Sequence, residues 1–134
     1  MGAAAAPADV LAGRAGSGRS DMSNIIRLHT GKDGQTHIEE LDLATHPELT
    51  TLQNTKGIVF RTTKPGYFSD WHNAPRRQFV IMLAGEVEIG LGNGAKHCYA
   101  PGHVTLAEDL TGKGHTTRVV GDQPRLSVTI PLAD

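Results

Sequence analysis

Cysteine is nearly absent from this 134-residue chain. Cys98 is the only one, which excludes an internal disulfide and a zinc site of several thiolates. Neither sign of charge predominates, because 13 basic and 14 acidic residues give a formal net charge of -1. That balance offers no electrostatic basis for binding nucleic acid or an anionic membrane. No stretch approaches the roughly 18 consecutive apolar residues of a membrane span. We therefore expect a cytoplasmic protein, with neither nucleic acid nor a membrane as its partner.

The N-terminus has little of what a targeting signal needs. It is rich in alanine and glycine, it lacks a basic start, and Pro7 and Asp9 interrupt its apolar part. Met22 opens a segment of different composition. We expect residues 1–22 to be a flexible leader and residues 23–134 to form one domain with a core of its own.

From Met22 onward, short β-favouring runs alternate with turns that are rich in glycine. The chain has 16 glycines and 7 prolines, and strands spaced at about 8–12 residues are typical of a sandwich or closed barrel. The single helical candidate, residues 43–52, contains Pro47, which favours a turn or loop there. We predict an all-β domain, a single barrel or jelly roll of about 8–11 strands over residues 25–131.

Two neighbouring segments differ in their hydrophobic pattern. Residues 79–83, FVIML, are apolar at every position, which predicts a strand covered on both faces. Residues 86–91, EVEIGL, alternate between polar and apolar, which predicts one face in the core and one in water.

Polar side chains are crowded just before the apolar run, in the segment SDWHNAPRRQ. In a straight strand, His72 and Gln78 would lie about 20 Å apart, too far to share a ligand. Pro75 cannot occupy a central strand, so residues 73–77 are predicted to form a turn between two strands. A reversal there would bring His72 and Gln78 together inside the barrel.

Residues 66–85 resemble the first motif of the cupin superfamily. That motif has a glycine, five residues, His-x-His, three residues, a glutamate, six residues and a glycine. Its five fixed positions are occupied here by Gly66, His72, Ala74, Gln78 and Gly85.

Residues 101–118, PGHVTLAEDLTGKGHTTR, resemble the second cupin motif, with His115 as its histidine. The turn before His115 is longer than usual, and Glu108 replaces a proline. The resemblance implies a small single-domain cupin with a central pocket for a small organic molecule. It also implies a homodimer, in which residues 25–28 and 36–41 lie against the partner or cover a sheet edge.

Metal-binding cupins use two histidines and the glutamate of the first motif, together with the histidine of the second. Here Ala74 and Gln78 replace two of these four, so the resemblance leaves His72 and His115 as strong ligands and Gln78 as a weak neutral one. These three would hold a divalent ion such as Zn, Fe, Ni or Mn. An inward-facing Asp70 or Glu108 could supply the missing negative charge.

Other roles for these residues follow from their chemistry. His72, His115 and Glu108 are candidate acids and bases, because such groups suffice for proton transfer in a dry pocket. Glu108 and Asp109 face opposite ways in a strand, so at most one reaches the pocket; alternatively, both end a strand and cap the next turn. Arg76 and Arg77 are either solvated or hold a carboxylate or phosphate at the barrel mouth. The candidate substrate-binding residues are Asp70, Arg76 and Gln78.

Three functions remain open on this basis. The first is an isomerase, lyase or cyclase that uses acid–base chemistry. The second is a non-catalytic barrel that binds a small molecule, and the third is a metal-dependent oxygenase with a degenerate metal site. Trp71 is interpreted as a packing residue and His103 as a turn residue. Structural roles are expected for the remaining histidines, namely His29, His37, His46 and His97.

Overall fold

The computed structural model describes residues 24–134, so the expected leader, residues 1–22, lies outside the described part. Ten strands span Ile25 to Pro131, which confirms the all-β prediction and its strand number. The strands are β1 (Ile25–Thr30), β2 (Thr36–Glu40), β3 (Val59–Thr63), β4 (Phe68–His72), β5 (Gln78–Ala84), β6 (Glu86–Gly90), β7 (Lys96–Tyr99), β8 (Val104–Glu108), β9 (His115–Val120) and β10 (Arg125–Pro131).

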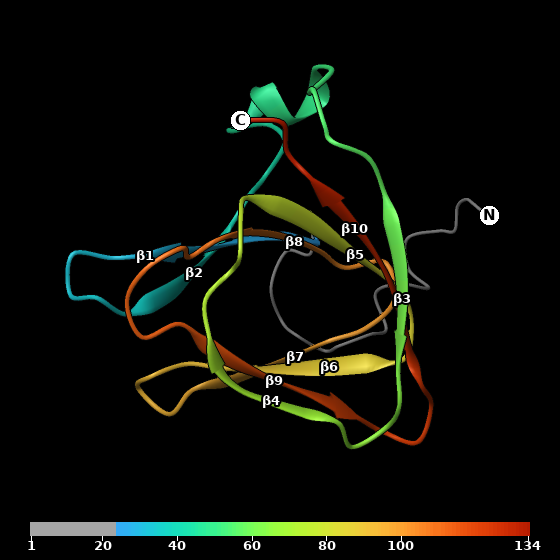
Figure 1. Ribbon diagram of the computed structural model, residues 1–134. Coiled ribbons are helices and arrows are strands. Elements are labelled where there is room, and N and C mark those ends of the chain that lie inside the picture. The colour runs from blue at the N-terminus through green and yellow to red at the C-terminus, as the bar shows by residue number, and fades with distance from the viewer. Residues whose placement is uncertain (1–23) are drawn as a thin grey trace.

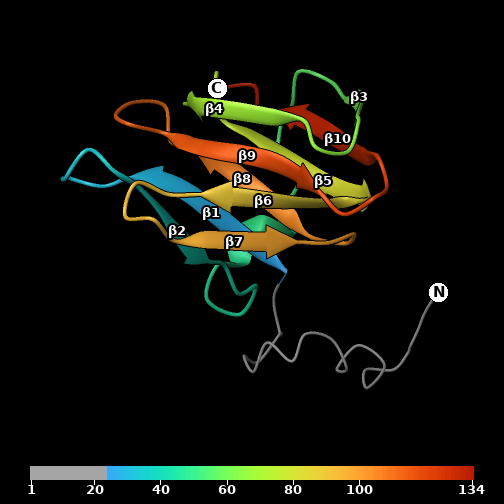
Figure 2. The same ribbon diagram turned by 90° about the horizontal axis from the view of Figure 1, so that it is seen from below.

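The strands form two sheets that face each other as a jelly roll (Figure 1). The larger sheet has the order β2-β1-β8-β5-β10-β3, and the smaller has the order β4-β9-β6-β7, which Figure 2 shows from below. All pairings are antiparallel except that of β1 with β8. The strand β2 lies at an edge of the larger sheet, whereas β1 is interior. The predicted homodimer stays a prediction.

Apolar side chains fill the space between the sheets at one end. Ile26 and Leu28 of β1 pack against Ile89 of β6, and Tyr99 of β7 lies beside them. Burying one such side chain fully contributes roughly 1.5–3 kcal/mol to folding. The alternation in residues 86–91 is confirmed, because Val87 and Ile89 are buried and face this interior.

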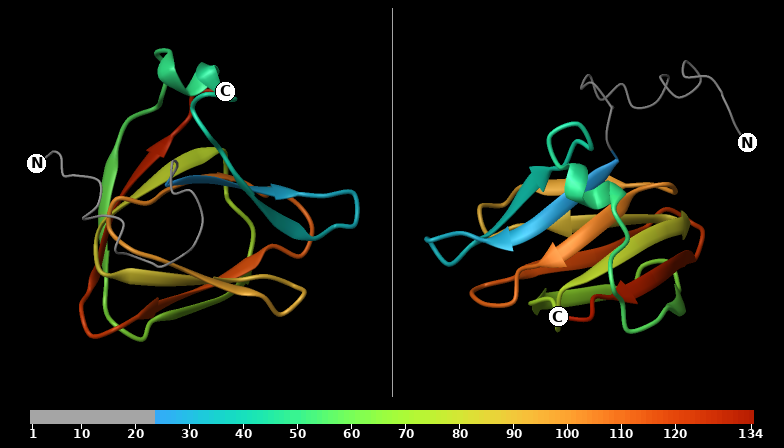
Figure 3. Two further views of the ribbon diagram at one scale, coloured as in Figure 1. Left: turned by 180° about the vertical axis from the view of Figure 1, so that it is seen from behind. Right: turned by 90° about the horizontal axis from the view of Figure 1, so that it is seen from above.

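The outer face of the larger sheet is covered only in part. A short 3-10 helix, Pro47–Thr50, lies over this face, where Leu49 packs on a cluster that includes Leu106 (Figure 3). Leu83 lies beyond this cover and is 46% exposed. The prediction that residues 79–83 are covered on both faces is therefore wrong for the end of β5.

No helix within residues 24–134 is both long and apolar enough to cross a membrane.

Candidate functional site

A cavity of about 330 Å³ lies between the sheets beside the apolar cluster of β1 and β6, because Leu28 and Ile89 also line its wall. This volume is at the small end of the range for ligand pockets, roughly 300–1,000 Å³. Val80, Met82 and other apolar side chains form part of its wall. The guanidinium and imidazole groups on the wall belong to Arg61, His72, Arg76, His115 and Arg125, and the amide of Gln78 lies there as well.

Residues 73–77 carry the chain from β4 in one sheet to β5 in the other, as the predicted turn requires. The turn is fastened to the loop between β8 and β9. The Asn73 amide donates hydrogen bonds to the carbonyls of Thr111 (2.9 Å) and Gly112 (3.2 Å). His72 at the end of β4 and Gln78 at the start of β5 consequently lie on the same cavity.

The two motif histidines meet where β4 pairs with β9, because His72 is the partner of His115 in that register. Their ring centroids are 4.4 Å apart, with the ring planes inclined at 58°. Gly114 permits this close approach. Its φ is +79°, and a Cβ there would lie only 2.2 Å from the His72 carbonyl oxygen. A side chain at residue 114 would thus push the two histidine strands apart.

Each histidine has one ring nitrogen fixed by an oxygen of the chain. Nδ1 of His72 donates to the backbone carbonyl of Asp70 at 2.7 Å, and the Ser69 hydroxyl lies 3.3 Å from the same nitrogen. Nδ1 of His115 donates to Oδ2 of Asp109 at 2.6 Å. In both rings, Nε2 is the nitrogen that remains for a ligand.

Asp109 is fully buried, with an exposed fraction of 0%. Its Oδ2 also accepts a hydrogen bond from the Thr36 hydroxyl at 2.8 Å, while its Oδ1 has no hydrogen-bond partner within the described chain. A carboxylate held in this way fixes the orientation and tautomer of the imidazole that it contacts. Asp109 therefore orients His115.

Glu108 does not line the cavity. Because side chains alternate along β8, Ala107 faces inward and Glu108 faces outward. Its carboxylate accepts hydrogen bonds from Arg27 (3.2 Å) and Arg77 (2.7 Å) on the outer face of the larger sheet. Glu108 and Asp109 thus face different ways, as expected, but Asp109 rather than Glu108 contacts a site residue, His115.

Asp70 is likewise absent from the cavity wall, and it contributes to the site through its backbone. Its carbonyl holds His72, whereas its carboxylate accepts a hydrogen bond from the Trp71 backbone N–H at 2.8 Å. The register of β4 against β9 shifts between Ser69 and His72, so simple alternation does not decide the direction of Asp70. Arg76 lines the cavity and is exposed.

No family model and no curated protein matches the chain. Among solved structures, it is similar to the polyketide cyclase RemF from Streptomyces resistomycificus at 13% identity and a TM-score of 0.50, over 81% of this chain and 75% of that one. A sugar phosphate isomerase from a cupin superfamily, from Silicibacter pomeroyi, matches at 17% identity and a TM-score of 0.48, over 76% of this chain and 61% of that one.

A protein with a double-stranded β-helix domain from Klebsiella pneumoniae matches at 24% identity and a TM-score of 0.47, over 61% of this chain and 71% of that one. The likeness to the polyketide cyclase concerns the fold alone and agrees with the two facing sheets. The chain has a cupin-like jelly-roll fold.

The donors of this cupin-like cavity supply only part of a divalent-cation site, because no carboxylate lines it within the described chain. His72 and His115 each have Nε2 available, and Oε1 of Gln78 is buried without a hydrogen-bond partner. Within residues 24–134, however, no three His, Cys, Asp or Glu side chains are grouped so that they could hold a metal ion. An ion bound here would be held by His72, Gln78 and His115, three neutral donors.

Sequence reasoning missed two arginines of the cavity, Arg61 on β3 and Arg125 on β10. The burial of Arg125 lowers the pKa of its guanidinium, and the positive charge of Arg61 lowers that pKa further. The alternation along β10 could have indicated that Arg125 shares a face with Ser127. Nothing in the sequence shows which strand lies beside β10.

Among the described residues, no phenylalanine, tyrosine or tryptophan lines the cavity, and His72 and His115 are the histidines that do. The prediction that His103 is a turn residue is confirmed, because its backbone N–H donates to the Ala100 carbonyl at 3.2 Å and closes the turn before β8. Its ring is nonetheless buried, at 7% exposed, and stacks on that of Tyr99 at a centroid distance of 3.8 Å. Trp71 is 43% exposed, and the ammonium group of Lys113 lies 4.5 Å from its ring centroid.

Proposed function

We propose that this cupin-like protein binds a small organic molecule in its cavity and catalyses proton transfer on it, as an isomerase, lyase or cyclase does. The observation that carries the proposal is the hydrogen bond of 2.6 Å between Nδ1 of His115 and the fully buried Asp109. It leaves Nε2 of His115 with a lone pair for a substrate proton. Histidine is the side chain most often used for such transfers.

His115 is the proposed base. When its Nε2 accepts a proton, the ring becomes positively charged, and the carboxylate of Asp109 stabilises that charge across the Nδ1 bond. The Thr36 hydroxyl holds Asp109 in position. The base is therefore oriented before any substrate enters, so that little reorganisation accompanies the reaction.

His72 is the proposed acid. Its Nδ1 is held by the Asp70 carbonyl, and its ring lies 4.4 Å from that of His115. A protonated Nε2 of His72 could donate to one atom of a substrate while His115 takes a proton from a neighbouring atom. The buried Oε1 of Gln78 can accept a hydrogen bond from a substrate hydroxyl and fix its position. The polyketide cyclase has the same fold, which supports the view that such a barrel can house this chemistry.

Solvent exchange tests the proposal without knowledge of the product. The protein is incubated in D₂O with a panel of small 2-oxo acids, hydroxy acids and sugar phosphates, and deuterium incorporation is read by NMR. We expect exchange next to a carbonyl group of one panel member. His115→Gln should slow it by at least about 100-fold, which is the lower end of what general acid–base catalysis contributes.

The matched control is His97→Gln, because His97 lies on β7 and does not line the cavity. This variant should exchange at the wild-type rate. A wild-type protein that binds a panel member without exchanging its protons would contradict the enzyme and favour the non-catalytic binding barrel.

A metal-dependent enzyme is the second candidate. It is favoured by the way His72 and His115 are held, since metal-ligating histidines donate their other ring N–H to a carboxylate or backbone carbonyl. A bound ion would supply Lewis-acid chemistry. Metal analysis of protein purified without a His-tag tests this candidate, and His72→Ala should abolish binding because only His115 and Gln78 would remain. Metal-free protein that still exchanges substrate protons would contradict it.

A further inference from the structure

Two arginines converge on one part of the cavity wall. Arg61 of β3 is directly opposite Ser127 of β10, and Arg125 lies two residues before Ser127. Residues two apart share a face of a strand, so Arg61 and Arg125 are diagonal neighbours with backbones about 7–8 Å apart. Both line the cavity, as does Ser127 between them.

Neither arginine has an acidic partner within residues 24–134. Among the described residues, no carboxylate forms an ion pair with Arg61 or Arg125. The Arg125 side chain donates a hydrogen bond of 3.2 Å from Nε to the Met82 thioether, a weak acceptor. A guanidinium has five N–H donors, so most donors of Arg125 remain for something else.

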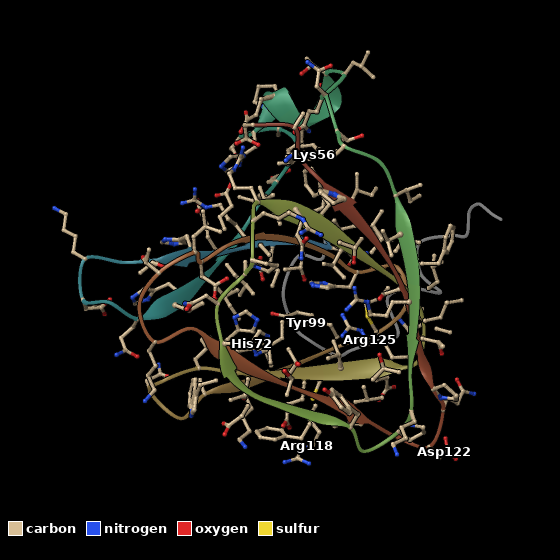
Figure 4. All side chains as sticks on the ribbon, in the orientation of Figure 1. Lys56, His72, Tyr99, Arg118, Asp122 and Arg125 are labelled. Atoms are coloured by element: carbon tan, nitrogen blue, oxygen red, sulfur yellow. The ribbon has the colours of Figure 1, made fainter. Side chains whose placement is uncertain are left out.

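Two other arginines of the same domain, by contrast, have partners. Arg77 contacts Glu108 and Asp134 on the surface, and Arg118 lies 4.4 Å from the Phe68 ring. Figure 4 shows Arg125 pointing into the ring of strands from the side opposite His72, while Arg118 points away from the barrel. Of Arg61 and Arg125, Arg125 is the more enclosed, and its positive charge faces that of Arg61.

We propose that Arg61 and Arg125 form an anion-binding subsite for the carboxylate or phosphate group of the molecule that the cavity holds. A planar guanidinium pairs with such oxyanions through two parallel hydrogen bonds. Ser127, which neighbours both arginines on the same wall, offers its hydroxyl as a further donor. One anionic group between them would offset the repulsion between the two positive charges. The proposal deepens the proposed function, on which it rests only in taking this cavity as the ligand site.

The subsite lies away from the histidines along the barrel. On β5, Met82 is opposite Ser127 and Gln78 is opposite Pro131, so the two regions are separated by four residues of strand, roughly 13 Å. A ligand would therefore extend along the cavity. Its anionic group would lie between Arg61 and Arg125, and its reacting atoms near His72 and His115. This defines the ligand class as small organic acids or phosphate monoesters.

The test follows the side-chain N–H signals of the arginines by NMR while inorganic phosphate or succinate is added to the full chain at millimolar concentration. We expect the Arg125 Nε–H signal to shift and to saturate. Saturation by phosphate alone would identify a phosphate monoester as the ligand class. Saturation by succinate alone would identify a carboxylate, and saturation by both would support the shared oxyanion chemistry.

Substitutions give the quantitative part of the test. Arg125→Met should weaken the binding of the anion by about 10–100-fold, the equivalent of one charge-assisted hydrogen-bonding partner. Arg61→Gln should weaken anion binding as well. Because Arg61 is exposed, this variant should fold normally and keeps the test valid if Arg125→Met misfolds. Arg118→Gln is the matched control and should bind as the wild type does.

Two results would overturn the subsite: no saturable shift of Arg125 with either anion, or wild-type affinity in both Arg125→Met and Arg61→Gln. The failure of the subsite and that of the proposed function are distinguishable. Proton exchange with uncharged substrates, without anion binding, would support the proposed enzyme and contradict the anion-binding subsite. Anion binding without any proton exchange would support the subsite and contradict the proposed enzyme.

Discussion

The two ends of the cavity contrast in how their polar groups are satisfied. At the histidine end, the backbone carbonyl of Asp70 holds His72, and the buried carboxylate of Asp109 holds His115. At the arginine end, Arg125 has a thioether as its hydrogen-bond acceptor, and no carboxylate of the described chain pairs with it. The described chain thus fixes the two histidine rings with its own oxygens, whereas the positive charge of Arg125 has no acidic partner in it.

This difference has a physical meaning. A group that must transfer a proton benefits from an orientation fixed in advance, because the surrounding dipoles then need not reorganise during the reaction. A group that binds a ligand must keep its donors free, and an enclosed charge without a partner lowers the stability of the empty protein. Five substitutions test this contrast and the contacts around it.

Asp109→Asn should have the largest effect. It removes the charge that stabilises a protonated His115, so proton exchange should fall by at least about 100-fold. The free energy of unfolding should fall by about 1–3 kcal/mol, because a buried hydrogen-bonding network is disturbed. Exchange assays and urea unfolding measure the two quantities.

Thr36→Val provides the comparison for Asp109→Asn. It removes one hydrogen bond from Asp109 but keeps the contact of Asp109 with His115, and it should lower the free energy of unfolding by only about 1 kcal/mol. Wild-type exchange in Asp109→Asn would contradict the role given to Asp109.

Arg125→Met should act in the opposite direction on the empty protein. Removing an enclosed positive charge that faces Arg61 should raise the free energy of unfolding by about 1 kcal/mol in a buffer without multivalent anions. Added phosphate should stabilise the wild type and reduce the gap, since a ligand stabilises only the form that binds it. A variant less stable than the wild type without anions would count against the uncompensated charge.

Glu108→Gln should affect stability and leave the cavity unchanged. Its carboxylate bridges Arg27 and Arg77, and its side chain is 15% exposed, so we expect a loss of about 1 kcal/mol. Anion binding and proton exchange should be those of the wild type. Slower exchange in this variant would restore Glu108 as a catalytic candidate.

Arg77→Met should have the smallest effect, visible as a change in pH dependence. The hydrogen bond from Arg77 lowers the pKa of Asp134 below its ordinary value of 3.8. A carboxylate whose pKa is lowered in the folded state stabilises the fold above the ordinary pKa, and this contribution is lost as the pH falls through the lowered value. Unfolding between pH 5 and pH 2 should thus depend less steeply on pH in Arg77→Met. An unchanged profile would show that this surface pair contributes nothing.

Part of the candidate site could be predicted from the chain alone. The spacing of His72, Pro75 and Gln78 indicated a reversal, and the structure places His72, Gln78 and His115 around one cavity. Their roles as ligands or catalysts stay predictions. The local pattern sufficed here because a turn of five residues links the first two, and the second motif supplies the third.

By itself, the sequence determined the short strands, the turns between them and the positions of the motif histidines, because all of these depend on local spacing and on glycine and proline. Only the tertiary structure decided which carboxylate supports His115. Side chains alternate along β8, and Glu108 falls on the outer face of its sheet, whereas Asp109, just beyond the strand, is buried against His115. It also decided that Arg61 and Arg125, far apart in the chain, share one wall. That proximity arises from the pairing of β3 with β10, and the choice of a neighbouring strand is made by the packing of the whole barrel.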